Sequence, residues 1–123
     1  MDSRTVLDKI VAIIGTHKAE DVIAFDVRKV VSYADYVLVC SGQSSRQVSA
    51  IGDHVVEDLK REGIEPLGIE GKHDGGWVLL DYGSIIVHLF DDPVRAFYNL
   101  EAMWSDAPRV PLALPAAPLQ AFH

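Results

Sequence analysis

Two apolar runs, residues 77–82 and 85–90, flank the dipeptide Gly83-Ser84, and this pattern constrains the fold more than any other part of the sequence. Short runs rich in branched and aromatic residues around a glycine-containing bend predict a β-hairpin. A turn centred on Gly83-Ser84 or on Tyr82-Gly83 gives registers that differ by two residues, so both assign the same residues to each face. We therefore expect the chain to fold around a β-sheet.

The periodicity of the remaining chain predicts three helices and three further strands around this hairpin. In chain order the elements are the helix 3–17 with Ser3 as its cap, the strands 22–27 and 36–40, the helix from Ser44 or Ser45 to a stop at Gly63, the strand 67–69, the hairpin, and the helix 94–104 behind the start signal Asp92-Pro93. This order predicts an α/β (α+β) sandwich with a mixed sheet of about five strands and three helices. Enzymes of the nucleotidyltransferase fold share the same order of elements.

The segment 108–123 differs in composition from the rest of the chain. Four of the six prolines fall there, at Pro108, Pro111, Pro115 and Pro118. Proline has no backbone N–H and disfavours regular helices and strands, so this segment is predicted to be an extended or disordered tail. The apolar side chains in it that could dock on the domain are Leu112, Leu114, Leu119 and Phe122. We expect one domain over residues 1–107, followed by the tail.

The charge balance favours a basic partner. Eleven Lys and Arg against eighteen Asp and Glu leave a net charge of −7. Nucleic-acid binding through charge requires a basic footprint, so direct nucleic-acid binding is not expected. The single cysteine, Cys40, leaves no internal disulfide to form, and the sequence shows no signal peptide, transit peptide or membrane-spanning run. We expect a cytoplasmic protein without membrane association.

Alternation along the hairpin divides its side chains between two faces of different character. The aliphatic face, expected to lie under the helices, carries Val78, Leu80, Tyr82, Ile85, Val87 and Leu89. The mixed face carries Trp77, Leu79, Asp81, Ile86, His88 and Phe90. Three helices are few for a five-stranded sheet, so we expect the mixed face to stay open as a protein-binding surface. The alternative is that the first helix or the tail covers it.

The junction between the strand 36–40 and the following helix is a candidate anion-binding turn. Its residues are Ser41, Gly42, Ser44, Ser45 and Arg46. Free backbone N–H groups at a helix start can hold an anion, although serine at this position is more often a helix cap, which is the interpretation we favour. A nucleotidyltransferase also needs paired carboxylates on the next strand to hold metal ions, and residues 66–70 supply only Glu70.

We therefore expect no catalysis, no metal and no cofactor. The alternative is a small nucleotide-binding or nucleotidyltransferase-like enzyme that uses the turn from Ser41 to Arg46.

Three separated blocks of sequence occur together in a recognisable order. They are Ala34-Asp35-Tyr36 with Ser41-Gly42-Gln43-Ser44-Ser45-Arg46-Gln47-Val48, then Glu70-Gly71 with Gly76-Trp77-Val78-Leu79-Leu80-Asp81-Tyr82-Gly83 and Val87-His88-Leu89-Phe90, and finally Arg95, Tyr98-Asn99-Leu100-Glu101, Trp104 and Asp106-Ala107. Together they resemble the motifs of the ribosomal silencing factor family (RsfS, or Iojap-like). The resemblance covers roughly residues 3–107.

The resemblance implies a nucleotidyltransferase-like fold without catalysis. It implies binding to the fourteenth ribosomal protein of the large subunit, uL14, at a bridge between the subunits, so that the small subunit cannot join and translation is repressed. It also implies that homodimers can form. As a further alternative, a second copy of the chain covers the mixed face in a homodimer.

The same resemblance assigns roles to the mixed face of the hairpin. Trp77, Leu79 and Phe90 are expected to supply apolar contact with the partner. Asp81 is expected to meet an Arg or Lys of the partner, and His88 to sit near the edge as a hydrogen-bond donor or as packing.

Overall fold

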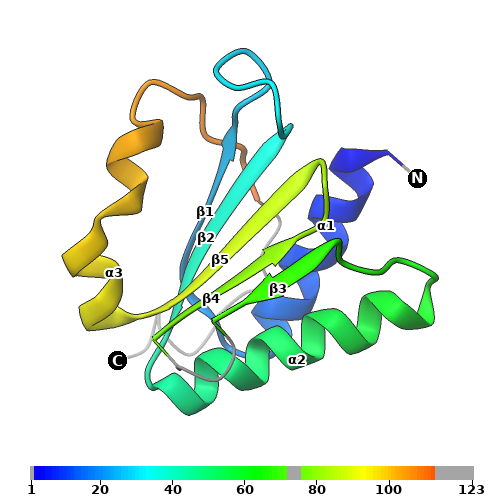
Figure 1. Ribbon diagram of the computed structural model, residues 1–123, viewed down its shortest axis with the longest axis vertical. Coiled ribbons are helices and arrows are strands. Elements are labelled where there is room, and N and C mark those ends of the chain that lie inside the picture. The colour runs from blue at the N-terminus through cyan, green and yellow to red at the C-terminus, as the bar shows by residue number, and fades with distance from the viewer. Residues whose placement is uncertain (1, 72–75, 113–123) are drawn as a thin grey trace, which may run out of the picture.

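Five strands form one mixed sheet in the order β1-β2-β5-β4-β3, in a computed structural model that describes residues 2–71 and 76–112 (Figure 1). In chain order the elements are α1 (Ser3–Thr16), β1 (Glu20–Asp26), β2 (Tyr36–Gly42), α2 (Ser45–Arg61), β3 (Gly68–Glu70), β4 (Trp77–Asp81), β5 (Ile85–Asp91), α3 (Asp92–Tyr98) and the 3₁₀ helix η1 (Leu100–Trp104). β2 and β5 are parallel, whereas the other neighbours are antiparallel. The predicted α/β class, with a mixed five-stranded sheet and three α-helices, is confirmed.

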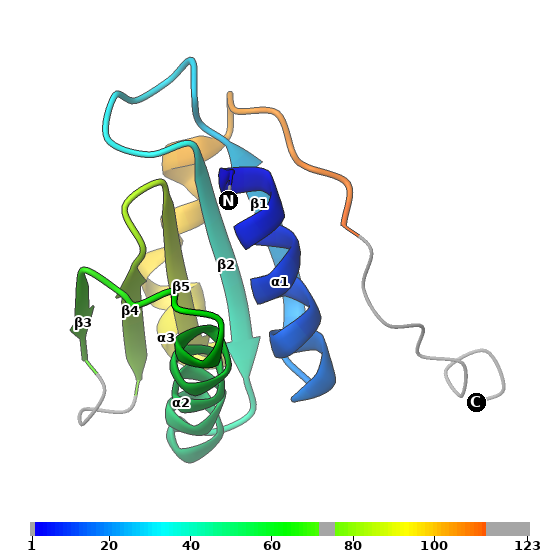
Figure 2. The same cartoon turned by 90° about the vertical axis from the view of Figure 1, so that its right-hand side faces the viewer.

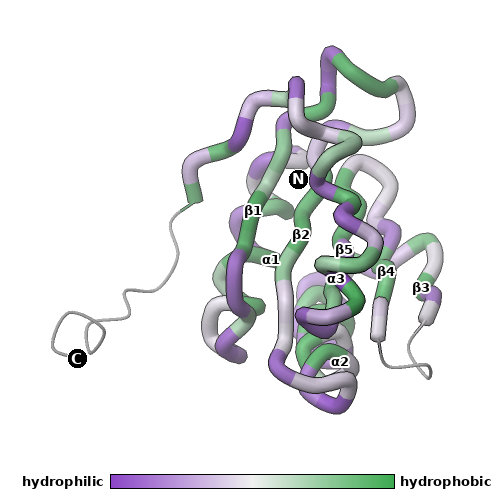
Figure 3. Tube along the Cα trace, turned by 90° about the vertical axis from the view of Figure 1, so that its left-hand side faces the viewer, coloured by the Kyte–Doolittle hydropathy of each residue, from purple (hydrophilic) through white to green (hydrophobic). Residues whose placement is uncertain are grey.

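The helices lie on both faces of the sheet. α1 and α2 cover one face, and α3 with η1 covers the other over β1, β2 and β5 (Figures 2 and 3). Two apolar cores result, one on each side. β2 lies between them and is buried along its whole length, as its continuous apolar sequence predicts.

The larger core fills the space between the sheet and the helices α1 and α2. It contains Leu7, Ile10, Val11 and Ile14 of α1, Val48, Ile51, Val55 and Leu59 of α2, and Val78, Leu80, Ile85, Val87 and Leu89 of the hairpin. The hairpin turn has Gly83-Ser84 at its centre, because Tyr82 N–H donates to the Ile85 carbonyl at 2.9 Å. The predicted aliphatic face of the hairpin therefore lies under helices.

Local capping sets the ends of α1 and α2. The Ser44 hydroxyl accepts a hydrogen bond from Gln47 N–H at 3.1 Å, and Gly63 follows the end of α2 with φ of +80°. The prediction that Ser3 caps α1 is wrong. The Asp2 carboxylate caps it instead by accepting from Thr5 N–H at 2.8 Å, and this hydrogen bond lowers the pKa of Asp2.

The predicted helix 94–104 consists of two shorter helices. Asn99 adopts a left-handed φ of 45°, which ends α3 and turns the chain into η1. Asparagine tolerates this conformation better than most residues, so Asn99 interrupts the continuous helical pattern that the sequence predicts. α3 begins at Asp92 with Asp91 at the N-cap position, so the prediction that Asp92 is the cap is wrong, and Pro93 lies in its first turn.

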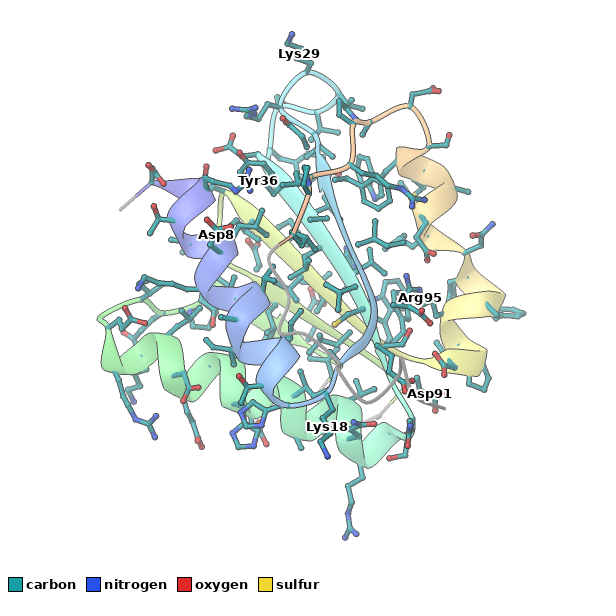
Figure 4. The ribbon with its side chains drawn as sticks, turned by 180° about the vertical axis from the view of Figure 1, so that it is seen from behind. Asp8, Lys18, Lys29, Tyr36, Asp91 and Arg95 are labelled. Carbon is teal, nitrogen blue, oxygen red and sulfur yellow. The ribbon has the colours of Figure 1, made fainter. Side chains whose placement is uncertain are left out.

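Arg95 holds this C-terminal unit on the sheet. Its Nη1 donates to the Ser41 hydroxyl at 2.7 Å and to the Asp21 carbonyl at 2.9 Å. Its Nε and Nη2 donate to the two carboxylate oxygens of Glu101 at 3.2 and 3.3 Å. The guanidinium lies between α3 and the sheet (Figure 4) and is buried, so one side chain connects α3, η1, β1 and β2.

The first residues of the predicted tail are ordered along β1. Asp26 N–H donates to the Pro108 carbonyl and Val110 N–H to the Ala24 carbonyl, both at 2.8 Å. Residues 108–110 of this segment therefore pair with β1. The predictions for Pro115, Pro118, Leu114, Leu119 and Phe122 lie outside the described residues. No helix in the described part of the chain is long and apolar enough to cross a membrane.

Replacing Arg95 should destabilise the domain. Arg95→Ala leaves the Glu101 carboxylate and the Ser41 hydroxyl without their donor, and we expect a loss of about 3 kcal/mol in the free energy of unfolding. Urea denaturation followed by circular dichroism measures it. Arg46→Ala, at an exposed arginine on α2, is the control and should change stability by less than about 0.5 kcal/mol. Equal unfolding midpoints for the two variants would contradict the role of Arg95.

Candidate functional site

A cleft of about 650 Å³ opens between the start of β4 and the exposed side of α3. Its lining residues are Glu70, Gly71, Gly76, Trp77, Leu79, Pro93, Val94, Phe97 and Tyr98. One wall comes from the β3–β4 region and the other from α3. The lining is mostly apolar and aromatic, with the carboxylate of Glu70 at its edge, which is the composition expected of a recognition surface.

Aromatic rings form the body of this cleft. Trp77 stacks on Phe90 with 5.0 Å between ring centroids and tilts against Tyr98 at 4.9 Å. Phe97 meets Tyr98 edge-on at 5.1 Å. Phe97 and Tyr98 remain 80% and 53% exposed, far more than large aromatic residues usually are. An exposed aromatic cluster on a rigid base is typical of a protein-binding hot spot.

His88 fixes the orientation of the Trp77 ring. The indole Nε1–H of Trp77 donates to Nδ1 of His88 at 3.1 Å. His88 is only 7% exposed, and this burial lowers the pKa of its imidazole to about 4. The ring is therefore neutral at pH 7, and its unprotonated Nδ1 can accept the indole proton. Trp77 is held by one hydrogen bond from its indole N–H, by stacking on Phe90 and by a tilted contact with Tyr98.

The structure confirms which hairpin residues share the mixed face, but it covers part of that face. Trp77 lies opposite Phe90, and Leu79 opposite His88. Trp77, Leu79 and Asp81 are partly exposed, whereas His88 and Phe90 are buried. The expectation that the whole face stays open is therefore wrong for these two. His88, expected near the edge as a hydrogen-bond donor or as packing, is packed inside and accepts a hydrogen bond instead of donating one.

α3 causes this difference. The chain leaves β5 at Asp91, whose N–H donates to the Gly76 carbonyl at 3.0 Å, and turns at once onto the mixed face. Phe90 then joins Trp104 and Ala107 in the second core. The first helix lies on the opposite face, so it does not provide this cover, and the alternative that the tail provides it falls largely on residues 113–123, which lie outside the described residues.

Asp81 has a partner within its own hairpin. Its Oδ1 accepts a hydrogen bond from Gly83 N–H at 2.8 Å, which supports the turn. The side chain is still partly exposed, and the other carboxylate oxygen has no hydrogen bond within the described residues. Asp81 can therefore support the turn and meet a cation at the same time.

Sequence reasoning missed the α3 wall of the cleft. Pro93, Val94, Phe97 and Tyr98 are spaced i, i+1, i+4 and i+5, which places them on one side of a helix. This spacing is the feature of the sequence that points to the α3 wall, whereas the helical pattern alone predicts only a helix. Gly71 was also missed: its φ is +80°, and a Cβ there would lie 1.9 Å from the Trp77 carbonyl oxygen, so only glycine fits.

The serine side chains of the predicted anion-binding turn already have hydrogen-bond partners within the protein. Ser44 caps α2, which confirms the favoured interpretation, and the Ser41 hydroxyl accepts from Arg95. The Ser45 hydroxyl faces the Asp91 carboxylate at 3.5 Å. A Cβ on Gly42 would meet the Val48 side chain at 3.0 Å, and Arg46 is exposed. With a carboxylate beside the turn, nothing in its geometry favours a bound phosphate.

Other reactive side chains of the described residues show no catalytic arrangement. Cys40 is fully buried, as predicted for a core residue, and burial raises the pKa of its thiol to about 12. His17 and His54 stack on each other with 3.6 Å between ring centroids. Within the described ranges, no group of three or more His, Cys, Asp or Glu is placed to hold a metal ion.

Fold and cleft together define a class: a small α/β domain with an exposed aromatic cleft at one end of its sheet. Residues 1–121 match the family described as "Ribosomal silencing factor during starvation". The chain therefore belongs to the ribosomal silencing factor family. The match extends past residue 107 into the proline-rich segment.

Individual relatives agree with this assignment. Ribosomal silencing factor RsfS of Halalkalibacterium halodurans is 38% identical over 112 residues, which cover 91% of this chain and 96% of the relative. A solved structure from Chromobacterium violaceum superposes with a TM-score of 0.83 at 32% identity and covers 95% of this chain and 97% of that one. The mouse protein named Mitochondrial assembly of ribosomal large subunit protein 1 is 30% identical over 102 residues, which are 80% of this chain and 45% of its own length.

The buried His88 should make stability depend on pH. Its pKa of about 4 in the folded state lies below the ordinary 6.5, so the unfolded chain binds the extra proton between these values. This contribution is complete above pH 6.5 and is lost as the pH falls to about 4, by up to about 3 kcal/mol. Urea unfolding at several pH values measures it.

His88→Gln is the control, because its amide oxygen can still accept from Trp77 but does not titrate in this range. Acidic groups contribute equally to both proteins. If the wild type and His88→Gln lose the same stability between pH 6.5 and 4, His88 is not the group responsible.

Proposed function

We propose that this chain silences ribosomes by binding the large subunit through its fourteenth protein, uL14, and blocking the small subunit from joining. The main observation in support of this proposal is the exposed aromatic cleft around Trp77, in a chain that belongs to the ribosomal silencing factor family. The name of the mouse relative, which refers to assembly of the large ribosomal subunit, supports the choice of subunit.

The binding surface in this proposal combines both walls of the cleft. Trp77 and Leu79 of β4, with Phe97 and Tyr98 of α3, supply apolar contact area. Asp81 lies further along the same face of β4, two residues beyond Leu79, and supplies a negative charge. His88 and Phe90 act indirectly in this proposal, by fixing the position of Trp77 from beneath.

Charge favours the encounter with a basic protein. The chain carries a net charge of −7, and ribosomal proteins are basic. Opposite net charges speed association and orient the partners as they approach. Glu70 places a carboxylate in the lining of the cleft, and Asp81 places a second one at the other end of β4.

The proposed mechanism is steric. A folded domain of this size on the subunit-facing side of the large subunit excludes the small subunit without a chemical step, so no catalytic residue is assigned. Such a protein works where ribosomes are, which for a bacterial factor is the cytoplasm. A homodimer that used the aromatic cleft would compete with ribosome binding, because both need the same exposed rings.

Sedimentation with ribosomal subunits tests the proposal. Purified protein is mixed with separated large and small subunits at low salt and run on a density gradient. We expect co-migration with the large subunit alone and a smaller peak of joined ribosomes. Absence from the large-subunit fractions, or an unchanged joined peak at saturating protein, would contradict the proposed function.

Trp77→Ala should weaken binding to the large subunit by about 2–4 kcal/mol, because it removes the ring at the centre of the aromatic cluster. Affinity can be measured by fluorescence anisotropy with a labelled chain. Tyr33→Ala removes an aromatic ring that is 60% exposed on the β1–β2 loop and serves as the control. If both variants are folded and bind equally well, Trp77 is not in the binding surface.

Charge changes at Asp81 should act through electrostatics. Asp81→Lys should weaken binding by about tenfold at low salt and by less at high salt, because salt screens an exposed charge pair. Asp81→Asn retains an oxygen that can accept from Gly83 N–H, so it isolates the loss of charge from the loss of the turn contact. A loss for Asp81→Lys that does not change with salt would indicate a damaged hairpin instead.

A further inference from the structure

β3 forms one edge of the sheet, and its outer side is open. The strand pairs with β4 from Gly68–Asp81 to Glu70–Leu79, and it is the last strand in the sheet order. All three of its residues are exposed, and no described segment pairs with its outer side (Figure 2). The opposite edge differs, because residues 108–110 pair there with β1. An open edge presents unpaired N–H and C=O groups, which are a template for a further strand.

One face of this edge exposes two large apolar side chains. Ile69 lies opposite Leu80 and is 39% exposed. Leu67, two residues earlier on the same face, is 77% exposed, and its N–H donates to the Asp81 carbonyl at 2.7 Å. Neither Leu67 nor Ile69 belongs to a core of the domain. Both are therefore free to contact apolar side chains of a strand added beside them.

The other face of this edge is acidic and open above Gly68. A Cβ on Gly68 would meet no atom within 4 Å, and its φ is not in the left-handed range, so the fold itself does not require glycine there. Glycine within a strand often marks a place where another backbone approaches closely. Gly68 lies opposite Asp81, and Glu70 follows it on the same face and lines the cleft. An approaching chain therefore meets two carboxylates here.

The charge of this edge selects a basic partner. Residues 62–71 contain three glutamates and no lysine or arginine. Glu62 pairs with Lys9 at 2.7 Å, whereas Glu65 and Glu70 are exposed and have no ion pair within the described residues. A strand that carries lysine or arginine is attracted to this edge, and an acidic strand, including a second copy of β3, is repelled.

We propose that β3 binds an extended segment of a basic partner protein, which adds to the sheet as a sixth strand. Side chains alternate between the faces of a strand, so the bound segment alternates as well. Lysine or arginine lies on the face of Glu70 and Asp81, and valine, isoleucine or leucine lies on the face of Leu67 and Ile69. β3 has three residues, so few backbone hydrogen bonds form and the side chains on both faces add to the affinity. The inference does not rest on ribosome binding.

The test uses the full chain and two synthetic peptides of equal charge. The probe is acetyl-Lys-Val-Lys-Val-Lys-Val-Lys-amide, and the control has proline in place of each valine, which removes N–H groups and disfavours pairing in a sheet. NMR follows amide exchange at residues 67–70 and detects nuclear Overhauser contacts between backbone protons of the peptide and of β3. Sedimentation at the same concentration reports whether the chain alone self-associates.

We expect the Lys-Val peptide to protect those amides of residues 67–70 that exchange freely in the chain alone. It should bind about tenfold more tightly than the Lys-Pro peptide, and more weakly at high salt. Leu67→Ser should weaken its binding about fivefold, because it removes an apolar contact. Val30→Ser, at an apolar residue that is 49% exposed on the β1–β2 loop, is the control and should leave binding unchanged.

Four results would overturn the proposal. They are equal binding of the two peptides, which means that charge alone holds them; backbone contacts at β1 or α3 instead of β3; β3 amides that a second copy already protects without peptide; and equal binding to the Leu67→Ser and Val30→Ser variants. If Leu67→Ser does not fold, Ile69→Thr, which keeps a β-branched side chain on the strand, takes its place in the same comparison.

Discussion

The parallel pairing of β2 with β5 decides where the other elements lie. The two strands pair from Tyr36–Ile85 to Gly42–Asp91, and parallel neighbours require a crossover connection, here made of α2, β3 and β4. Because both strands are buried on both faces, the sheet needs cover on each side. β4 then returns antiparallel to β5, so its first residue, Trp77, lies at the end of the sheet where α3 begins. The cleft is a consequence of this topology.

Two polar contacts position the two walls of the cleft. The wall from β4 depends on the hydrogen bond between Trp77 and His88, which selects one orientation of a large ring that could otherwise rotate. The wall from α3 depends on Arg95, whose planar guanidinium reaches three partners at once. Buried polar groups of this kind favour a single arrangement of the apolar surface around them. The aromatic rings provide the contact area, and these polar groups fix where it is.

Much of this fold could be predicted because local pattern and topology agree. The alternation of side chains along the hairpin predicts the correct face for every residue. The continuous apolar run of β2 predicts a strand that is covered on both sides. The serine cap of α2 and the glycine after it were equally visible, since capping is a local property.

What could not be predicted depended on contacts between distant parts of the chain. The burial of His88 and Phe90 follows from the direction that α3 takes after β5, which no periodicity encodes. The break at Asn99 is a single backbone conformation within an otherwise helical pattern. Arg95 looked like an ordinary helix residue, because its partners Ser41 and Asp21 are 54 and 74 residues away in the sequence. The pairing of residues 108–110 with β1 is of the same kind, since proline content suggests disorder when seen without its partner strand.

Because β4 and α3 each supply one wall of the cleft, the ribosome synthesises the two walls at different times. Synthesis proceeds from the N-terminus, so Trp77 and Leu79 leave the ribosome before Phe97 and Tyr98 do. Glu101, which accepts hydrogen bonds from Arg95, and residues 108–110, which pair with β1, emerge later still. A growing chain therefore carries one wall of the cleft before it gains the other wall. In a protein proposed to stop ribosomes, this order separates the ribosome that makes the chain from those that the finished chain can bind.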